Sequence, residues 1–332
     1  MSATMPPPQK QKQAADPGSV ERFAADLTAL AGPDWHDKRY GVAVSGGPDS
    51  MALLWLVASL LPGQVWAATV DHKLRRGSAD EARMVAGYCA REHVPHAILH
   101  PAAPIAGSLQ AAARTERYRL LEQWREAQAL DHILTAHHAD DQLETMIMRL
   151  NRSSGVGGLA GVRASNGAVL RPLLHWRRDE LAGLALDADL PIAQDPSNAD
   201  IRFDRARLRH ALQAQLFLDP QAAARSAQWL GEADAALDWA VGAAIATWPD
   251  ADDPSVIRDR DYPDEIFRRI VERRLRANDP RLGLRGDTLG GVIAAMRAGR
   301  RAMVGELLID AVKGSGKDFW RILAAPRRKA RL

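Results

Sequence analysis

Cysteine is almost absent from this sequence. Cys89 is the only one in 332 residues, which excludes a disulfide framework and a zinc site built from cysteines. Long apolar runs are absent too, since no stretch is long enough to span a bilayer. Residues 1–19 are rich in Pro, Gln and Ala and lack the apolar centre of a signal peptide. We therefore expect a cytoplasmic protein with no membrane partner, in which residues 1–19 form a disordered tail.

The remaining chain is long enough for two globular domains. Hydrophobic residues make up 46% and charged residues 26% of the sequence, as in soluble globular proteins. The net charge is only +3, which permits a nucleic-acid partner without requiring one, so clusters of arginine are more informative. Composition changes near Asp219–Pro220. We expect one domain over 20–218 and a smaller, mainly helical domain over 219–332, with a strand pair at 303–309 and 319–323.

Apolar runs alternate with helical segments through the first domain. This alternation predicts an α/β fold with a parallel sheet flanked by helices. Ligands of such sheets bind outside the carboxyl ends of the strands, and polar side chains gather at the expected strand ends. The expected strands are 40–44, 64–70, 97–99, 132–136 and 169–174, and the expected helices are 20–31, 51–61, 78–92, 108–128, 140–150, 178–188 and 202–216.

The segment between the first strand and its helix has the chemistry of a phosphate cradle. Its glycines let backbone N–H groups approach a phosphate, and the helix that follows presents its positive end. The Asp49 carboxylate would repel phosphates unless a cation lay between them, so we interpret it as a Mg²⁺ ligand. We expect Ser50 to cap the helix; the alternative is a tight turn before a core helix. The predicted ATP-binding residues here are Ser45, Gly46, Gly47, Pro48, Asp49 and Ser50.

This hexapeptide resembles the PP-loop of the N-type ATP pyrophosphatases, which cleave ATP between the α and β phosphates. It is not a Walker loop, because no Gly-Lys-Ser/Thr follows.

A second motif, residues 137–145, stands at the end of the fourth expected strand and the start of a helix. Asp141, Glu144 and Thr145 fall close to one face of that helix. An Asp and a His at the cleft suit two tasks, holding Mg²⁺ and neutralising a leaving pyrophosphate. The alternatives are a transition-metal site or a structural cap formed by Asp140.

Several basic segments are candidates for binding the nucleotide or RNA. Residues 71–78 follow the second strand, where backbone groups could contact an adenine edge, although a solvated turn fits equally. On the helix after residue 108, Arg114 or Arg117 could bind a phosphate or lie on a solvated face. Residues 195–198 precede an arginine-rich helix that suits pyrophosphate or an RNA backbone, or is simply exposed. That helix carries Arg202, Arg205, Arg207 and Arg209.

The glycine-rich segment 155–160 nominally matches a dinucleotide fingerprint. Because the match follows a helix and not a strand, we reject that interpretation and expect residues 151–161 to form a mobile substrate loop instead.

Together these motifs resemble the tRNA(Ile)-lysidine synthetases over about residues 40–212. The family usually has Arg-Asn where this chain has Arg205-Ala206, and the C-terminal region resembles the family only loosely. The resemblance rests on Ser45–Ser50, Asp71–Arg75, His137–Thr145 with Arg149-Leu150, Gly155–Gly161, Arg171–Leu174 and Asp195–Asn198.

The resemblance implies a reaction in two steps. The C2 carbonyl oxygen of the wobble cytidine in a tRNA(Ile) with a CAU anticodon attacks the α-phosphate of ATP, with Mg²⁺ bound, and pyrophosphate leaves. The ε-amine of free L-lysine then attacks C2 and AMP leaves, giving lysidine and changing the specificity from Met to Ile.

It also implies residue roles. His137 and Asp141 would assist adenylation, Asp49 and Asp141 would hold Mg²⁺, and Glu144 would meet lysine. The implied catalytic residues are Asp49, His137, Asp141 and Arg205, and Asp71 and Arg114 join the ATP-binding set. The C-terminal arginines would position tRNA through its phosphates.

Alternatives remain at this stage. One is another PP-loop ligase or a tRNA thiolase, although the thiolases commonly carry paired cysteines. Another is a non-catalytic nucleotide- or RNA-binding module. The sequence leaves the oligomeric state open, a homodimer included.

Overall fold

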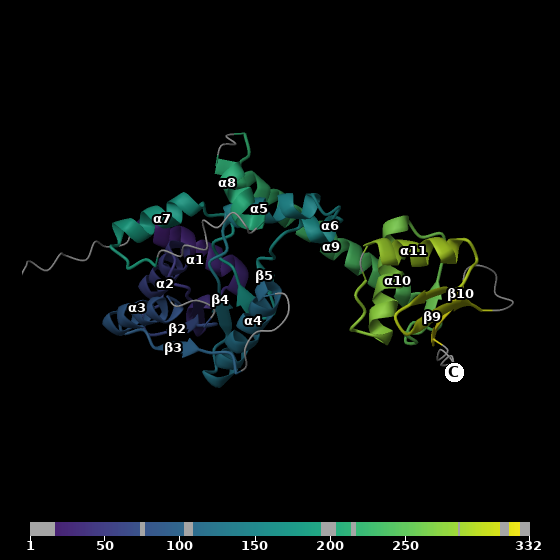
Figure 1. Ribbon diagram of the computed structural model, residues 1–332, viewed down its shortest axis with the longest axis horizontal. Helices are drawn as coiled ribbons and strands as arrows, with labels where there is room; N and C mark the ends of the chain where they lie inside the picture. The colour runs from purple at the N-terminus through teal and green to yellow at the C-terminus, as the bar shows by residue number, and fades with distance from the viewer. Residues whose placement is uncertain are drawn as a thin grey trace, which may run out of the picture. The chain divides into compact units, whose positions relative to one another are not determined.

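The computed structural model describes residues 17–73, 77–102, 109–193, 204–213, 217–284, 286–312 and 319–325. The chain divides into two compact units between Gly231 and Glu232 (Figure 1). This division lies inside helix α9 (Pro220–Ala246). The change of composition near Asp219–Pro220 marks the start of that helix. A proline is tolerated there since the first helical N–H groups have no partner within the helix. Helix α1 begins at Pro17, so the last residues assigned to the tail are helical.

A mostly parallel sheet forms the centre of the first unit, as predicted. Among the described residues six strands lie in the order β3-β2-β1-β4-β6-β5, and every neighbouring pair is parallel except β5 with β6. The last expected strand is shorter than predicted because Pro172 has no N–H to donate to a sheet. The strands are β1 (Tyr40–Ala43), β2 (Val65–Val70), β3 (His96–Leu99), β4 (His132–Leu134), β5 (Ser165–Asn166) and β6 (Val169–Leu170).

Helices cover both faces of this sheet. Side chains alternate between the faces along each strand, so Val42 of β1 and Val44 just after it join a core with α1, α2, α3 and α7. Ala43 faces the other way, into a core with Leu121 and Trp124 of α4. The helices are α1 (Pro17–Ala31), α2 (Pro48–Leu60), α3 (Ser78–Arg91), α4 (Leu109–Ala127), α5 (Ala139–Leu150), α6 (Val156–Leu159), α7 (Arg178–Asp187) and α8 (Asp204–Gln213), with a 3₁₀ turn at Trp35–Asp37.

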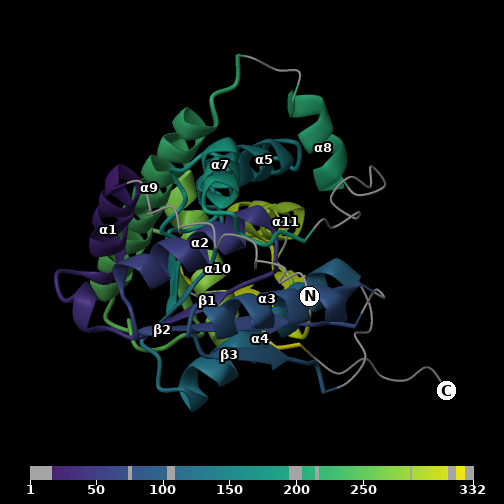
Figure 2. The same ribbon diagram turned by 90° about the vertical axis from the view of Figure 1, so that its left-hand side faces the viewer.

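The strand order places the exits of β1 and β4 together. The chain passes from β1 to β2 and β3 on one side and then returns to β4 on the other side of β1. Connections therefore diverge from neighbouring parallel strands, which is the arrangement that opens a ligand crevice in such sheets. Figure 2 views this unit with the sheet between its helices.

The second unit combines helices with a small antiparallel sheet. Its described strands lie in the order β7-β10-β9-β8. The predicted strand pair is confirmed, although 303–309 contains parts of two strands that turn at Gly305. The elements are the second half of α9, β7 (Val256–Arg258), α10 (Asp264–Asn278), α11 (Gly286–Arg297), β8 (Ala302–Val304), β9 (Leu307–Ala311) and β10 (Phe319–Ala324). Among the helices that the structure describes, none combines the length and apolar composition needed to cross a bilayer.

Candidate active site

The loop after β1 folds through its own serines. The Ser50 hydroxyl donates to the Gly47 carbonyl at 3.0 Å and accepts from the Ser45 N–H at 3.1 Å. Gly46 has φ +87°, a conformation that side chains with a Cβ rarely adopt. The expectation that Ser50 caps α2 is wrong: the helix begins at Pro48 with Gly47 as its N-cap. Ser50 instead shapes the loop, which leaves the N-terminus of α2 to an external acceptor.

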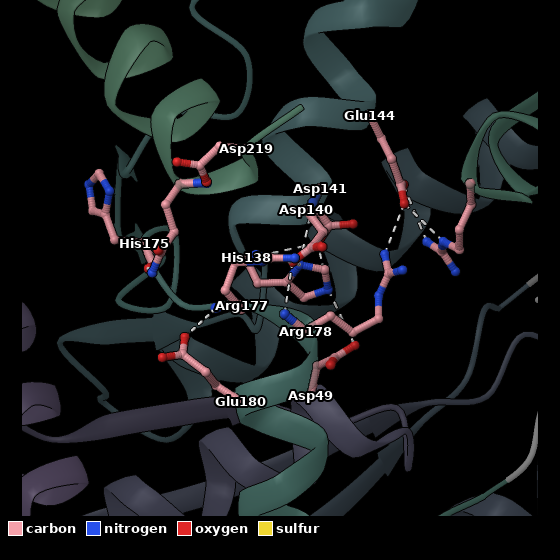
Figure 3. A network of polar contacts seen from close by, with 12 residues as sticks. Asp49, His138, Asp140, Asp141, Glu144, His175, Arg177, Arg178, Glu180 and Asp219 are labelled. Atoms are coloured by element: carbon pink, nitrogen blue, oxygen red, sulfur yellow. Dashed lines mark hydrogen bonds and ion pairs between the residues drawn. The ribbon is translucent and has the colours of Figure 1, made fainter. Parts of the chain in front are cut away.

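A buried histidine lies among three aspartates at the start of α5 (Figure 3). The His138 side chain is 2% exposed, and its Nε2 lies 3.5 Å from Asp49 Oδ2 and 3.6 Å from Asp141 Oδ2. On the other side of the ring, Nδ1 lies 3.7 Å from Asp140 Oδ2 and accepts the Asp141 N–H at 3.3 Å. His138 therefore links the first turns of α2 and α5.

Two opposing influences act on the pKa of His138. Burial alone lowers it, but the hydrogen bond to Asp49 and the charges of Asp141 and Asp49 raise it overall. Because Nδ1 accepts a backbone N–H, the ring proton lies on Nε2, where it faces the carboxylates of Asp49 and Asp141.

The neighbouring His137 differs in both contacts and charge. Its Nδ1 is 3.0 Å from the Thr135 hydroxyl. Burial and the charges of nearby arginines lower its pKa to about 3, although Asp141 opposes the shift. His137 is therefore neutral at physiological pH and can exchange hydrogen bonds without adding charge to the site.

Glu144 is the centre of an arginine cluster. Its side chain is 2% exposed and contacts three arginines among the described residues, with Oε1 2.8 Å from Arg178 and 2.9 Å from Arg209, and Oε2 2.9 Å from Arg205. Burial raises the pKa of this carboxyl, but the hydrogen bonds and charges of the arginines bring it down to about 2. Arg205 also reaches Asp141 Oδ1 at 3.2 Å. The cluster thus fixes α8 and the start of α7 against α5.

Several of these residues open onto a common cavity at the exits of β1 and β4, whose lining does not include His138 or Glu144. Its volume is about 240 Å³. Of the predicted site residues, Ser45, Gly47, Asp49, Ser50, Arg114, His137, Asp141 and Arg205 line it, together with Ala43, Arg117, Thr135 and Ala136.

A second cavity adjoins the first across Ala43, Ser45 and Arg117. It has a volume of about 210 Å³ and lies at the exits of β1 and β2. His72 and the apolar side chains of Val44 and Val70 also line it.

Asp71 was predicted to bind ATP, but its carboxylate turns toward its own loop. It accepts the Lys73 N–H at 2.8 Å and the Ser78 hydroxyl at 2.7 Å. Burial raises the pKa of this carboxyl, and these hydrogen bonds outweigh burial and lower it. The following residue, His72, is the one that lines the second cavity. Asp71 therefore shapes the loop that carries His72.

Asp49 fits the role of a magnesium ligand. Its Oδ1 atom is buried and has no hydrogen-bond partner among the described residues, and such an atom is suited to a cation. Asp141 is more fully engaged, since its oxygens meet Arg205 and the His138 N–H. The described residues contain no group of three or more His, Cys, Asp or Glu side chains arranged around a metal position. Mg²⁺ beside phosphates commonly uses only one or two carboxylates.

Known proteins are similar to this chain over most of its length. A family model described as a PP-loop domain matches residues 20–216. The tRNA(Ile)-lysidine synthase of Novosphingobium aromaticivorans is 40% identical over 94% of this chain and 96% of its own length. That of Zymomonas mobilis is 36% identical over 88% of this chain and 90% of its own. The chain belongs to the tRNA(Ile)-lysidine synthase family.

A solved structure supports the same fold for this family member. The U34-tRNA thiolase of Methanococcus maripaludis has a TM-score of 0.54 and 15% identity, covering 65% of this chain and 81% of that protein. That thiolase holds a 4Fe–4S cluster, and such clusters are held by several cysteine thiolates. The only cysteine here, Cys89, is buried in α3, so the likeness extends to the fold alone.

Two residues of this synthase-family site, His138 and His72, have side chains to which the sequence assigned no role. His138 was not assigned a role, although its place immediately before a helix and beside two aspartates was a signal for an N-cap. His72 lines the second cavity, and Arg117, which the sequence offered beside Arg114 as a phosphate ligand, lines both cavities. Ser197 and Arg202, in the predicted pyrophosphate motif, lie outside the described residues.

Proposed function

We propose that this protein ligates L-lysine to C2 of the wobble cytidine of a tRNA(Ile) with a CAU anticodon, using ATP and forming an adenylated cytidine intermediate. The single observation that carries the proposal is one cleft containing the PP-loop, Asp49, His137, Asp141 and Arg205, in a chain whose relatives are lysidine synthases. The cytoplasm, where these three substrates meet, is the expected location.

The loop and its flanking arginines suit the first step. The free N–H groups at the start of α2 and the hydroxyl of Ser45 favour the phosphates, and the second cavity suits the adenosine. Asp49 and Asp141 would hold Mg²⁺, which would neutralise charge on the phosphates as pyrophosphate leaves. Arg114 and Arg117 line the same cavity and lie within reach of the phosphate oxygens, to which a guanidinium binds strongly.

His137 suits a neutral role in adenylation. With a pKa of about 3, its ring can donate a hydrogen bond to the cytidine or to a phosphate oxygen without binding an additional proton.

Glu144 was expected to meet lysine, but its contacts with arginines favour a positioning role. Both of its oxygens already accept hydrogen bonds from arginines. A lysine ammonium that reached it would have to displace one of them. We therefore propose that Glu144 chiefly positions Arg205 beside Asp141, and that lysine binding through Glu144 would require α8 to move.

Tests of this function need the complete reaction. We expect the protein to transfer radiolabelled lysine to a tRNA(Ile) transcript with a CAU anticodon, with one AMP and one pyrophosphate released per lysine. Asp49→Ala should abolish transfer while tRNA binding persists. Adenylation of another acceptor with release of pyrophosphate, and with no label in RNA, would refute the proposal in favour of another PP-loop ligase. Light scattering of the purified protein would decide between a monomer and the homodimer considered above.

A further inference from the structure

A groove between α5 and α8 is not used by the chemistry described above. It has a volume of about 340 Å³, within the usual range of about 300 to 1,000 Å³ for small-ligand sites. Figure 1 shows α8 beside α5, and the contacts of Arg205 and Arg209 with Glu144 join the two helices. The groove is lined by Met148, Asn151, Arg152, Asp204, Arg207, Leu208 and Ala211.

The groove has an apolar lining and a polar rim. Met148, Leu208 and Ala211 supply apolar surface, while Asn151 and the Asp204–Arg207 ion pair supply hydrogen-bond donors and acceptors. Arg152 is exposed and lies within ion-pair distance of no carboxylate among the described residues. A ligand with a flat apolar face, a polar edge and a negative charge matches this surface.

The groove lies on the same two helices, α5 and α8, that contribute residues to the active site. Asp141, Glu144, Met148 and Arg152 follow one another on α5 and beyond its end at spacings of three or four residues, which place them along one side of a helix. At 1.5 Å per residue, Arg152 lies roughly 16 Å from Asp141 along the helix axis. α8 likewise turns Arg205 and Arg209 toward Glu144 and Leu208 toward the groove.

We propose that this groove binds an unpaired nucleotide of the RNA substrate, next to the nucleotide that is modified. The proposal rests on the proposed function, because the RNA must place its target base in the cleft. Single-stranded loops are recognised by apolar contacts with splayed bases and by contacts with their phosphates. Met148 and Leu208 would contact the base, and Arg152 would contact its phosphate.

The experiment compares three variants by their affinity for an anticodon stem-loop RNA at several salt concentrations. Ala211→Trp fills the groove from an exposed position, and Arg152→Ala removes the rim charge. Arg91→Ala is the matched control, since Arg91 is an exposed arginine on α3 that stacks on Tyr88. Binding of ATP and of free lysine is measured in parallel, and the thermal unfolding midpoint checks that each variant is folded.

The expected results separate the base contact from the phosphate contact. Ala211→Trp should weaken RNA binding by about tenfold or more, as loss of one base contact does, with an unchanged salt slope. Arg152→Ala should reduce the slope of log K against log salt by about 0.7, the value for one phosphate of a single strand, and Arg152→Lys should restore it. Arg91→Ala should behave as wild type.

RNA affinity and salt slope equal to wild type in Arg152→Ala would overturn the proposal, even if Ala211→Trp failed to fold. Weakened binding of lysine or ATP with unchanged RNA binding would overturn it as well. Failure of the proposed function looks different: the wild-type protein would bind the RNA without incorporating lysine.

Discussion

Replacing Glu144 with glutamine tests how strongly the arginine cluster holds the active site together. The substitution keeps the size of the side chain and removes its charge. The guanidinium groups of Arg178, Arg205 and Arg209 would then face one another without their shared carboxylate. Breaking a buried ion pair by removing one partner is strongly destabilising, because it leaves uncompensated charge.

The pKa of the Glu144 carboxyl shows how much free energy of unfolding its charge contributes. It falls from 4.5 to about 2 in the folded protein, a difference that corresponds to roughly 3 kcal/mol of stability at neutral pH. Because the pKa is depressed by folding, this stabilisation is fully present above pH 4.5 and is lost as the pH falls toward 2. The difference in the free energy of unfolding between wild type and Glu144→Gln should therefore be about 1 kcal/mol smaller at pH 4 than at pH 7.

Hydrogen exchange of the α5 amides in increasing urea measures this difference without assuming that both units unfold together. We expect Glu144→Gln to lower the limiting protection of α5 by about two powers of ten at pH 7, since each 1.4 kcal/mol is about tenfold. The control is Glu122→Gln on α4, whose partner Arg125 is paired with it at the surface, where such pairs contribute about 0 to 1 kcal/mol.

A loss of hydrogen-exchange protection in Glu144→Gln no larger than the loss in Glu122→Gln would refute this account of the cluster. So would a difference from wild type that stayed constant from pH 7 to pH 4, because the carboxylate charge would then not be its source.

Three further predictions concern the loop and the two histidines. His137→Asn should slow lysine transfer by the same factor at every pH between 5.5 and 8, because a His137 pKa of about 3 leaves no protonation step in that range; a ratio that changes with pH would contradict this. His138→Asn should raise the Mg²⁺ concentration needed for half-maximal transfer more than it raises the KM for lysine, because Asp49 loses the contact at 3.5 Å; equal effects would indicate general misfolding. Gly161→Ala should destabilise the segment 151–161, which was expected to be a loop but contains helix α6, by roughly 1 to 3 kcal/mol, since its Cβ would lie 2.3 Å from Gln142 Oε1 at a φ of +63°, and limited proteolysis of the segment would detect this.

The sheet and the nucleotide loop were predictable because their causes are local. Alternating apolar runs and helices predict a parallel sheet, and Ser45–Ser50 contains the glycines and the hydrogen-bond donors of a phosphate-binding loop. The exact first residue of a helix was not predictable in the same way. α5 begins at Ala139, one residue before the expected start, and this makes His138 its N-cap. A shift of one residue therefore decided which of two adjacent histidines faces the aspartates, and no periodicity resolves that difference.

Other errors arose from contacts between distant segments. Nothing local shows that Glu144 meets arginines from two other helices, because Arg178 and Arg209 are 34 and 65 residues away. In contrast, the pairing of arginines within α10 had a sequence signal. Glu265 precedes Arg268 and Arg269 by three and four residues, the spacing at which helix side chains form ion pairs, and those pairs are present.

The charges in the two units bear on where RNA phosphates bind. Phosphate binding depends on cations whose charge is not already neutralised. On α10, Arg268, Arg269 and Arg276 pair with carboxylates of the same unit, and Arg274 is buried, which leaves Arg273 exposed. In the catalytic unit Arg114, Arg117, Arg149 and Arg152 have no carboxylate within ion-pair distance among the described residues. Within the part of the chain that the structure describes, cations available to RNA phosphates therefore lie around the cleft and the α5–α8 groove, and the second unit retains Arg260, Arg273 and Arg300 as exposed arginines without a carboxylate partner.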